Sequence, residues 1–224
     1  MPSRRLTPRF LASCGLWILI VPPGHSQTPT TGTTHFILDG NRMYAEVGFV
    51  RPNGTLRKAL VFVDLGSPSA VLSQELLKEL DLGSKKVLAF EVGDLMVTTD
   101  SGEVTSDPWL PFSISDHRTV EGLLPAGILK KYQVVIDYAQ RTLTLAEPGT
   151  LGLEGLSVPF QMNEKTGLIS VEMTISGKTY RVTIDNGSAY TWLRKATAQE
   201  WFTAHPDRGA RHRRRRPQQH ADGR

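Results

Sequence analysis

The sequence predicts a mostly β protein in which one β-rich lobe is followed by an incomplete second copy of that lobe. Two observations lead to this prediction. From Phe36 onward, short apolar runs rich in β-branched residues alternate with Gly, Pro, Asn and Asp turn signals, which is typical of antiparallel strands. One strand–turn–helix pattern also occurs twice, and the apolar sequence ends soon after its second occurrence.

The composition is that of an ordinary globular chain. Of the 224 residues, 39% are apolar and 21% are charged, which excludes a collagen, a coiled coil, a low-complexity chain and a multi-span membrane protein. The formal net charge is +4, but ten basic residues and one acid lie in the first ten residues and beyond Asp207. The remaining 16 basic and 21 acidic residues carry a net charge of −5, so a nucleic-acid partner is not favoured.

The amino-terminal residues have the pattern of a secretory signal peptide. Arg4, Arg5 and Arg9 precede the apolar run Phe10–Val21, and small residues precede a cleavage position near Ser26. The run is shorter than the roughly 20 residues that a membrane-spanning helix needs. We therefore expect the mature chain to be exported, periplasmic or secreted, without a transmembrane span.

The single cysteine, Cys14, lies inside this segment. The mature chain would therefore have no disulfide, no thiol nucleophile and no thiolate metal site. The six histidines show no metal-ligand spacing. The sequence accordingly predicts neither a cofactor nor a metal.

Several secondary-structure elements have clear local signals. Ser73 is a favourable N-cap for a helix that ends at Leu80, because three leucines would share one face. Asp100-Ser101-Gly102 is a hairpin turn signal. Strands are expected over residues 43–50, 57–64, 133–138, 141–146, 169–175 and 179–185, with helical segments over 127–132 and from 197 to 201.

The composition of the connecting segments divides the chain into six parts. Thr, Pro and Gly follow the signal peptide, and one Pro with three Gly follows residue 146, which indicates a boundary between lobes. The parts are the signal peptide 1–26, a linker 27–35, a first lobe 36–146, an inter-lobe linker 147–155, a partial second lobe 156–207 and a basic tail 208–224.

The internal repeat centres on two Asp-x-Gly-Ser turns. Asp64-Leu65-Gly66-Ser67 follows one expected hairpin, and Asp185-Asn186-Gly187-Ser188 follows another at an offset of 121 residues. Leu72 and Leu193 recur at the same offset. A single such motif is usually only a turn, whereas two in the same strand–turn–helix context indicate internal duplication.

Two equivalent strand ends of this kind can bring their carboxylates together across a pseudo-twofold axis. Glycine in each turn lets the two backbones approach. Carboxylates about 3 Å apart cannot both ionise, so they share one proton, as in the aspartic-protease dyad. One carboxylate can then take a proton from a bound water while the other protonates the carbonyl under attack.

Two longer segments resemble the retropepsin-like aspartic peptidases, in particular the bacterial exported, single-chain, two-lobe forms. One is Leu60–Ser67, and the other is Gly122–Leu145, in which a lobe-closing turn precedes Val-Ile-Asp-Tyr and Arg-Thr-Leu-Thr-Leu. The resemblance covers residues 36–146 and, as a truncated second lobe, residues 156–203. It implies a retropepsin-like β-barrel lobe followed by an incomplete second copy.

The resemblance also implies an aspartic-type endopeptidase that hydrolyses peptides or unfolded proteins. Asp64 and Asp185 would be the catalytic pair, and the hairpin around residues 91–106 would be the flap over the cleft. The family has Thr or Ser after each catalytic Asp, whose hydroxyl braces the pair, where this chain has Leu65 and Asn186. These two residues favour an alternative, a catalytically inactive protein that binds peptides or a protein partner in the same cleft.

Three further points stay open at this stage. Catalysis could instead use a homodimer in which two first lobes each supply Asp64. Trp109 and Trp192 could line a peptide cleft, although isolated aromatic residues more often belong to a core. Residues 208–224 resemble nothing in that family and are interpreted as a disordered terminus or the product of another reading frame.

Overall fold

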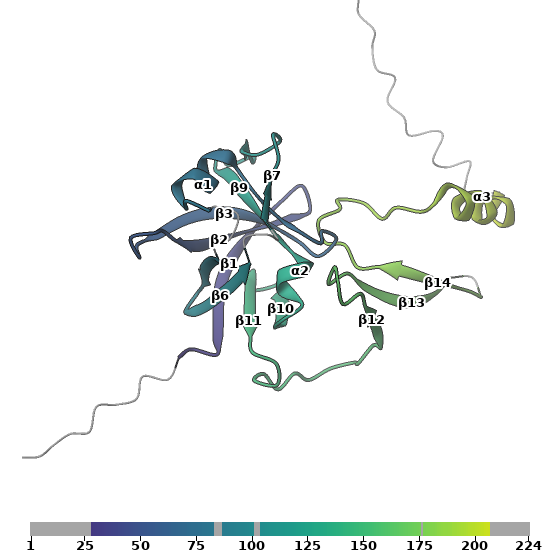
Figure 1. Cartoon of the computed structure of the whole chain (residues 1–224). Coiled ribbons are helices and arrows are strands. Elements are labelled where there is room, and N and C mark those ends of the chain that lie inside the picture. Colours follow the sequence, from purple (N-terminus) through teal and green to yellow (C-terminus); the bar gives the residue numbers. More distant parts are fainter. Residues whose placement is uncertain (1–27, 83–86, 101–103, 176, 207–224) are drawn as a thin grey trace, which may run out of the picture.

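The computed structural model describes residues 28–82, 87–100, 104–175 and 177–206. The predicted signal peptide and basic tail lie outside these residues. The described chain is mostly β and contains two separate sheets, a large one within residues 31–146 and a small one within residues 160–183 (Figure 1). We call residues 31–146 the first lobe and residues 160–206 the second lobe.

The large sheet has 11 strands, and two short helices accompany it. The elements of the first lobe are β1 Thr31–Asp39, β2 Arg42–Val50, β3 Leu56–Asp64, β4 Ala70–Leu72, α1 Gln74–Glu79, β5 Val87–Val92, β6 Leu95–Asp100, β7 Val104–Ser106, β8 Phe112–Ser113, β9 Thr119–Pro125, α2 Ala126–Leu129, β10 Gln133–Asp137 and β11 Thr142–Ala146. The main path of the sheet runs β10-β11-β1-β2-β3-β9-β4-β7, with β5 and β6 attached at β2 and β8 at β9.

Strand β3 lies in the middle of this sheet. Its residues 59–63 are all buried, as expected for a strand that is covered on both faces. It pairs antiparallel with β2 and parallel with β9, and the register places Asp64 beside Pro125. Because parallel strands end at the same edge, the end of β3 and the start of α2 lie together, and this edge carries the first Asp turn.

The first lobe contains the hydrophobic core of the described chain. Its buried apolar residues come from strands β1–β6, β9 and β11, from both helices and from the segments between these elements. Helix α1 begins as predicted, because the Ser73 Oγ accepts a hydrogen bond from the amide of Leu76 at 3.1 Å. Leu76 and Leu80 are buried against the sheet.

The second lobe is smaller and far more exposed. It consists of β12 Phe160–Met162, β13 Ile169–Ile175, β14 Lys178–Thr183 and α3 Lys195–Ala204. The three strands form an antiparallel sheet in the order β12-β13-β14, and α3 lies beyond it, away from the large sheet (Figure 1). None of the buried apolar residues of the described chain belongs to these elements.

A comparison of equivalent positions shows the same difference in packing. Val63, directly before the first Asp, is 0% exposed, whereas Ile184, directly before the second, is 39% exposed. Leu72 is 1% exposed and Leu193 is 51% exposed. The hairpin of β2 and β3 and the hairpin of β13 and β14 both lead into an Asp turn, but in the described structure the first has further strands paired on both of its sides, whereas the second has only β12, paired with β13.

The turn predicted at Asp100-Ser101-Gly102 includes residues that lie outside the described chain. A tight turn that was not predicted lies earlier, at Gly93–Asp94, where Val92 pairs with Leu95 and β5 pairs with β6. Strand β7 pairs with β4 rather than with β6. A glycine with φ +56° that packs against the β1 backbone at Thr33 makes the earlier turn possible.

The flap predicted over residues 91–106 is only partly described. Its described residues belong to the β5–β6 hairpin and to β7, and residues 101–103 lie outside the described chain. The hairpin turn packs on β1, so the described part of the flap segment contributes to the large sheet.

The linker predicted over residues 27–35 is partly wrong. Residues 31–35 form the first half of β1 and pair with β11, from Thr31 beside Ala146 to His35 beside Thr142. The Thr and Gly composition suggested a linker, but threonine suits a strand and Thr33 bonds through its hydroxyl to Thr144 at 2.8 Å. In the second lobe, β14 ends at Thr183, two residues before the predicted end at Asp185.

No helix in the described ranges is long and apolar enough to cross a membrane.

We expect equal Leu→Ala substitutions in the two parts of the chain to have unequal effects. Leu145→Ala removes a side chain that is 0% exposed in β11, so it should cost about 2–5 kcal/mol of unfolding free energy. Leu156→Ala removes a side chain that is 101% exposed and should change it by less than about 0.5 kcal/mol. Urea denaturation of both variants checks this, and similar losses would contradict the assignment of the core to the first lobe.

Candidate active site

The first Asp turn is fixed between β3 and α2. The amide of Gly66 donates to the Asp64 Oδ1 at 2.8 Å, and the amide of Ser67 donates to the Asp64 carbonyl oxygen at 3.3 Å. The Ser67 Oγ donates to the carbonyl of Ser69 at 3.2 Å. The carbonyl of Ser67 accepts from the amide of Ala126, the first residue of α2, at 3.0 Å. The turn therefore has partners at both of its ends.

The second Asp turn has similar internal hydrogen bonds, but the amide of its serine donates to the carboxyl group of the Asp rather than to its backbone carbonyl. The amides of Gly187 and Ser188 both donate to the Asp185 Oδ1 at 3.0 Å. The Ser188 Oγ donates to the carbonyl of Tyr190, two residues later, at 2.6 Å, as the serine of the first turn does. The Nε1 of Trp192 in turn donates to that hydroxyl at 2.6 Å. In both turns the serine hydroxyl therefore donates to a backbone carbonyl two residues later rather than to the carboxyl group.

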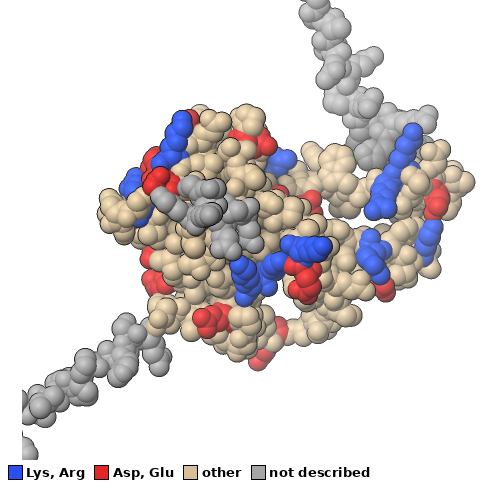
Figure 2. All heavy atoms as spheres, in the orientation of Figure 1, with Lys and Arg blue, Asp and Glu red and all other residues tan. Residues whose placement is uncertain are grey.

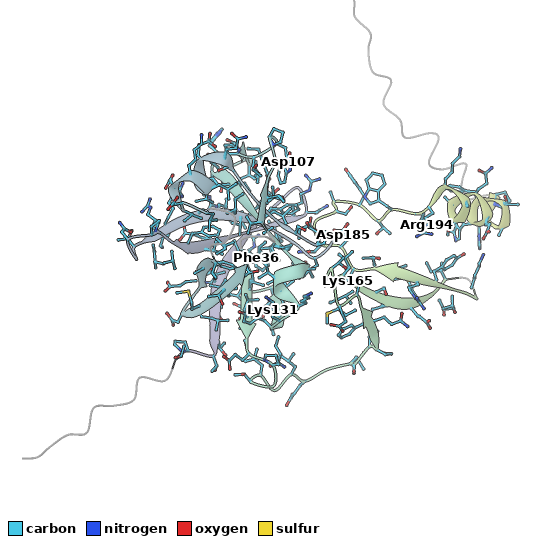
Figure 3. All side chains as sticks on the ribbon, in the orientation of Figure 1. Phe36, Asp107, Lys131, Lys165, Asp185 and Arg194 are labelled. Atoms are coloured by element: carbon cyan, nitrogen blue, oxygen red, sulfur yellow. The ribbon has the colours of Figure 1, made fainter. Side chains whose placement is uncertain are left out.

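The structure brings the two turns together, and each carboxyl lies against the glycine of the opposite turn. A Cβ atom on Gly66 would lie 2.5 Å from the Asp185 Cγ, and one on Gly187 would lie 2.2 Å from the Asp64 Oδ1. Any side chain at either position would collide with the opposite carboxyl group, so this approach requires glycine in both turns. Figure 3 shows Asp185 at the junction of the two lobes.

Asn186 connects the second turn to the end of β3. Its Oδ1 accepts from the amide of Leu65 at 2.7 Å, and its Nδ2 donates to the carbonyl of Val63 at 3.1 Å. The side chain of Leu65 cannot return such a bond and packs against the hydrophobic core of the first lobe. The contact between the turns is therefore asymmetric, with its polar side chain supplied by the second lobe.

Two further contacts join the lobes. The Nε of Arg42, at the start of β2, donates to the carbonyl of Gly187 at 3.2 Å. The Nζ of Lys130, directly after α2, donates to the carbonyls of Glu164 and, at 3.4 Å, Lys165. Both contacts are made by a basic side chain of the first lobe to backbone carbonyls of the second lobe.

The surroundings of Asp64 raise its pKa above the ordinary value of 3.8. Burial is the largest cause, because it disfavours the ionised form, and the nearby carboxyl of Asp185 acts in the same direction. The amide of Gly66 and the guanidinium of Arg42 oppose the shift. Asp64 therefore keeps a proton at a pH where an exposed aspartate has lost it, while Asp185 lies exposed beside it.

An aromatic depression of about 360 Å³ lies beside the two turns. Its rings are in mutual contact, with centroid distances of 5.4 Å between Tyr44 and Phe62 and 6.2 Å between Tyr44 and Phe112. One guanidinium group and the backbone of the second turn complete its wall. The lining residues are Arg42, Tyr44, Phe62, Trp109, Phe112 and Gly187.

Most of these residues were not identified in the sequence. Tyr44 pairs with Phe62 across β2 and β3, and the period-2 alternation of the strands places Arg42 and Asp64 on the same face two residues further along. The alternation of side chains along the two strands could have identified these residues, but only if the pairing of β2 with β3 had been known. Trp109 lines the depression, as one sequence interpretation suggested.

Trp192 has a different position. It is 78% exposed and bonds to the second turn through its ring nitrogen. It does not line the depression.

Charged groups do not form a metal centre in the described ranges, where no group of three or more His, Cys, Asp or Glu could hold a metal ion. On the face shown in Figure 2, Lys and Arg side chains are interspersed with Asp and Glu side chains over both lobes.

The chain was compared with protein families, curated proteins and solved structures. No protein-family model matches the chain, and a search of curated proteins found no match. Among solved structures, the chain is similar to the crystal structure of a retropepsin-like aspartic protease from Rickettsia conorii, with 16% sequence identity and a TM-score of 0.35. This similarity covers 52% of this chain and 92% of that chain.

We expect Gly187→Ala to separate the two turns. The new methyl group would occupy the position of the Asp64 carboxyl, so this carboxyl would move away from Asp185 and its pKa would fall towards 3.8. Carboxyl-carbon NMR titration measures this pKa. Gly152→Ala is the matched control, because a Cβ there meets nothing within 4 Å. An unchanged pKa in Gly187→Ala would contradict the contact.

The raised pKa of Asp64 also predicts a pH-dependent stability. The folded chain holds this proton more tightly than the unfolded chain, so the free energy of unfolding should fall as the pH rises above 3.8 through the folded-state pKa. Asp64→Asn lacks this fall and should gain stability relative to the unaltered chain between pH 4 and pH 7. Urea denaturation of both chains across this pH range measures the difference. Asp94→Asn, on the exposed β5–β6 turn, is the control. If the unfolding free energies of Asp64→Asn and the unaltered chain change with pH in parallel, the raised pKa of Asp64 is refuted.

Proposed function

We propose that the chain is an aspartic-type endopeptidase that hydrolyses peptide bonds through a water activated by Asp64 and Asp185. The observation that carries this proposal is the close packing of the two Asp turns, in which each carboxyl lies against the opposite glycine. Two carboxyls in such contact share a proton, and the raised pKa of Asp64 supports its role as the protonated member.

The proposed reaction needs only these two groups and a water. The Asp185 carboxylate takes a proton from the water as the water oxygen attacks the peptide carbonyl carbon, and protonated Asp64 gives its proton to the carbonyl oxygen. The resulting tetrahedral diol collapses when its nitrogen is protonated by Asp185 and a hydroxyl proton returns to Asp64. The C–N bond then breaks to give a carboxylic acid and an amine.

We propose that the aromatic depression receives a side chain of the substrate. It lies against Gly187, so a peptide that presents its carbonyl to the aspartates would pass next to it. Its volume of about 360 Å³ and its aromatic wall suit a large apolar side chain of a peptide or unfolded protein. The signal-peptide pattern supports action outside the cytoplasm, with cleavage near Ser26.

The alternative proposal is a catalytically inactive protein that binds peptides in the same cleft. The specific observation in its favour is Leu65, which leaves the first turn without a side-chain hydrogen bond to the second. Both proposals use the aromatic depression, and they differ in whether the bound peptide is cut.

Cleavage of an unfolded protein by the purified chain across pH 3–7 tests the proposal. Asp64→Asn and Asp185→Asn each remove one titrating acid and should lower kcat on the order of 10⁴-fold, whereas the control Asp94→Asn should not. A bell-shaped pH profile is expected, because one carboxyl must be protonated and the other ionised.

The outcomes separate the two proposals. Cleavage that persists equally in Asp64→Asn would come from a contaminant and would reject the role of this residue. Binding without cleavage by a well-folded sample would favour the inactive peptide-binding protein.

A further inference from the structure

We propose that the second lobe binds an anionic lipid surface through the segment that ends the described chain. This segment, residues 190–205, consists of a short extended stretch followed by α3, and we call it the docking segment. The proposal goes beyond the proposed function, because no residue of the docking segment lines the aromatic depression. It would stand even if the chain cut no peptide.

The docking segment exposes several large apolar side chains. Tyr190 is 74% exposed and Trp192 is 78% exposed, and Leu193 and Phe202 are exposed as well. Single exposed apolar residues are ordinary, whereas a concentration of them marks a binding surface. Tyr and Trp are enriched where an apolar layer meets water, because each combines an apolar ring with a polar tip. The composition of the segment therefore suits the boundary between lipid and water.

Helix α3 has an aromatic face and no core beneath it. The i, i+3, i+4, i+7 spacing puts four residues on one face, namely Ala198, Trp201, Phe202 and His205. The Trp201 ring lies 5.5 Å from that of Phe202 and stacks on His205 at 4.8 Å. None of the ten residues of α3 is buried, and a helix of this length is marginal in water without packing. A lipid surface would supply that packing.

Two basic residues stand where the helix itself does not favour them. Arg194 is the N-cap of α3 and Lys195 is its first residue, as Figure 3 shows for Arg194. The amino end of a helix carries a partial positive charge, so cations there are unfavourable. In the described structure the Arg194 side chain makes no capping hydrogen bond, and Glu200, the single acid of α3, pairs with Lys178 of β14. An anionic surface gives the two cations a partner.

Charge is divided unequally between the two ends of the molecule. Counting Lys, Arg, Asp and Glu, residues 189–224 contain nine bases and three acids, a net charge of 9 − 3 = +6. Residues 31–146 contain 11 bases and 14 acids, a net charge of 11 − 14 = −3. An anionic surface therefore attracts the docking segment and repels the first lobe. Because α3 lies away from the large sheet (Figure 1), docking there leaves the first lobe clear of the surface.

These features fit a lipid surface better than a nucleic acid. Leu193 has neither a ring that could stack on a base nor a hydrogen-bonding atom, whereas an apolar side chain beside basic residues suits insertion between lipid headgroups. The signal-peptide pattern also predicts an exported chain, which would meet phospholipid.

Vesicle co-sedimentation tests the proposal on the mature chain, which lacks the apolar run Phe10–Val21. We expect binding to mixed phosphatidylglycerol and phosphatidylcholine vesicles to be at least about tenfold tighter than binding to phosphatidylcholine alone, and to weaken with added salt. Tyr190→Ala with Phe202→Ala should weaken it by about tenfold or more. The control Tyr138→Ala removes a tyrosine that is 53% exposed in the first lobe and should have no effect. Equal binding to both kinds of vesicle would overturn the proposal.

A second pair of variants tests the position of the charges. Arg194→Gln with Lys195→Gln should weaken binding to the mixed vesicles on the order of tenfold. Lys58→Gln with Lys131→Gln removes the same charge from exposed positions of the first lobe and is the matched control. Equal weakening by the two pairs would mean that only the net charge matters and would refute the docking segment.

Fluorescence quenching identifies which residues enter the lipid. The mature chain has three tryptophans, Trp109 in the first lobe and Trp192 and Trp201 in the docking segment. Mixed vesicles that contain brominated phosphatidylcholine should quench the bound chain and the Trp109→Phe variant alike. Quenching should be largely lost in Trp192→Phe with Trp201→Phe. Quenching of the remaining tryptophan to the full extent would show that another surface binds the lipid.

Two other occupants of the docking segment give different results. Tighter binding to double-stranded DNA than to the mixed vesicles, lost in Arg194→Gln with Lys195→Gln, would identify a nucleic acid as the ligand and reject the lipid. A concentration-dependent dimer without vesicles, abolished by Tyr190→Ala with Phe202→Ala, would assign the segment to a second copy of the chain. The expected result is a monomer that binds the anionic vesicles in preference to DNA.

Discussion

The hydrogen-bonded contact between Asn186 and the end of β3 is the constraint on which the rest of the candidate site depends. It spans Asp64 by bonding to the residues before and after it, and it starts from the residue that follows Asp185. This contact lies where each carboxyl approaches the opposite glycine. Burial is the largest cause of the raised pKa of Asp64, and the neighbouring carboxyl of Asp185 adds to it.

The two lobes contribute to the site in different ways. The first lobe is held by a buried core around β3, which makes the end of that strand a rigid platform. The second lobe exposes most of its apolar side chains and meets the first through polar contacts of Asn186, Arg42 and Lys130. Its position is therefore set by a few directional bonds near the aspartates rather than by the packing of a shared core.

Local signals in the sequence predicted much of the first lobe. The Ser73 cap and the leucine pattern predicted α1, and the apolar run before Asp64 predicted β3. The turn at Gly93 was not predicted; glycine there adopts a positive φ, and the turn packs on β1. Local residue types indicate where a turn is possible, and tertiary packing decides at which of these positions the chain turns.

The sequence by itself determined the mostly β character, the two Asp-x-Gly-Ser turns and the glycines that let these turns approach, because each depends on local residue type. Only the tertiary structure decided that Asn186 would bond across to the backbone around Asp64, and that Arg42, Tyr44, Phe62 and Phe112 would gather in one depression. These contacts join residues that are distant in the chain. They follow from the register of β2 on β3 and from the docking of the second turn, which no local pattern specifies.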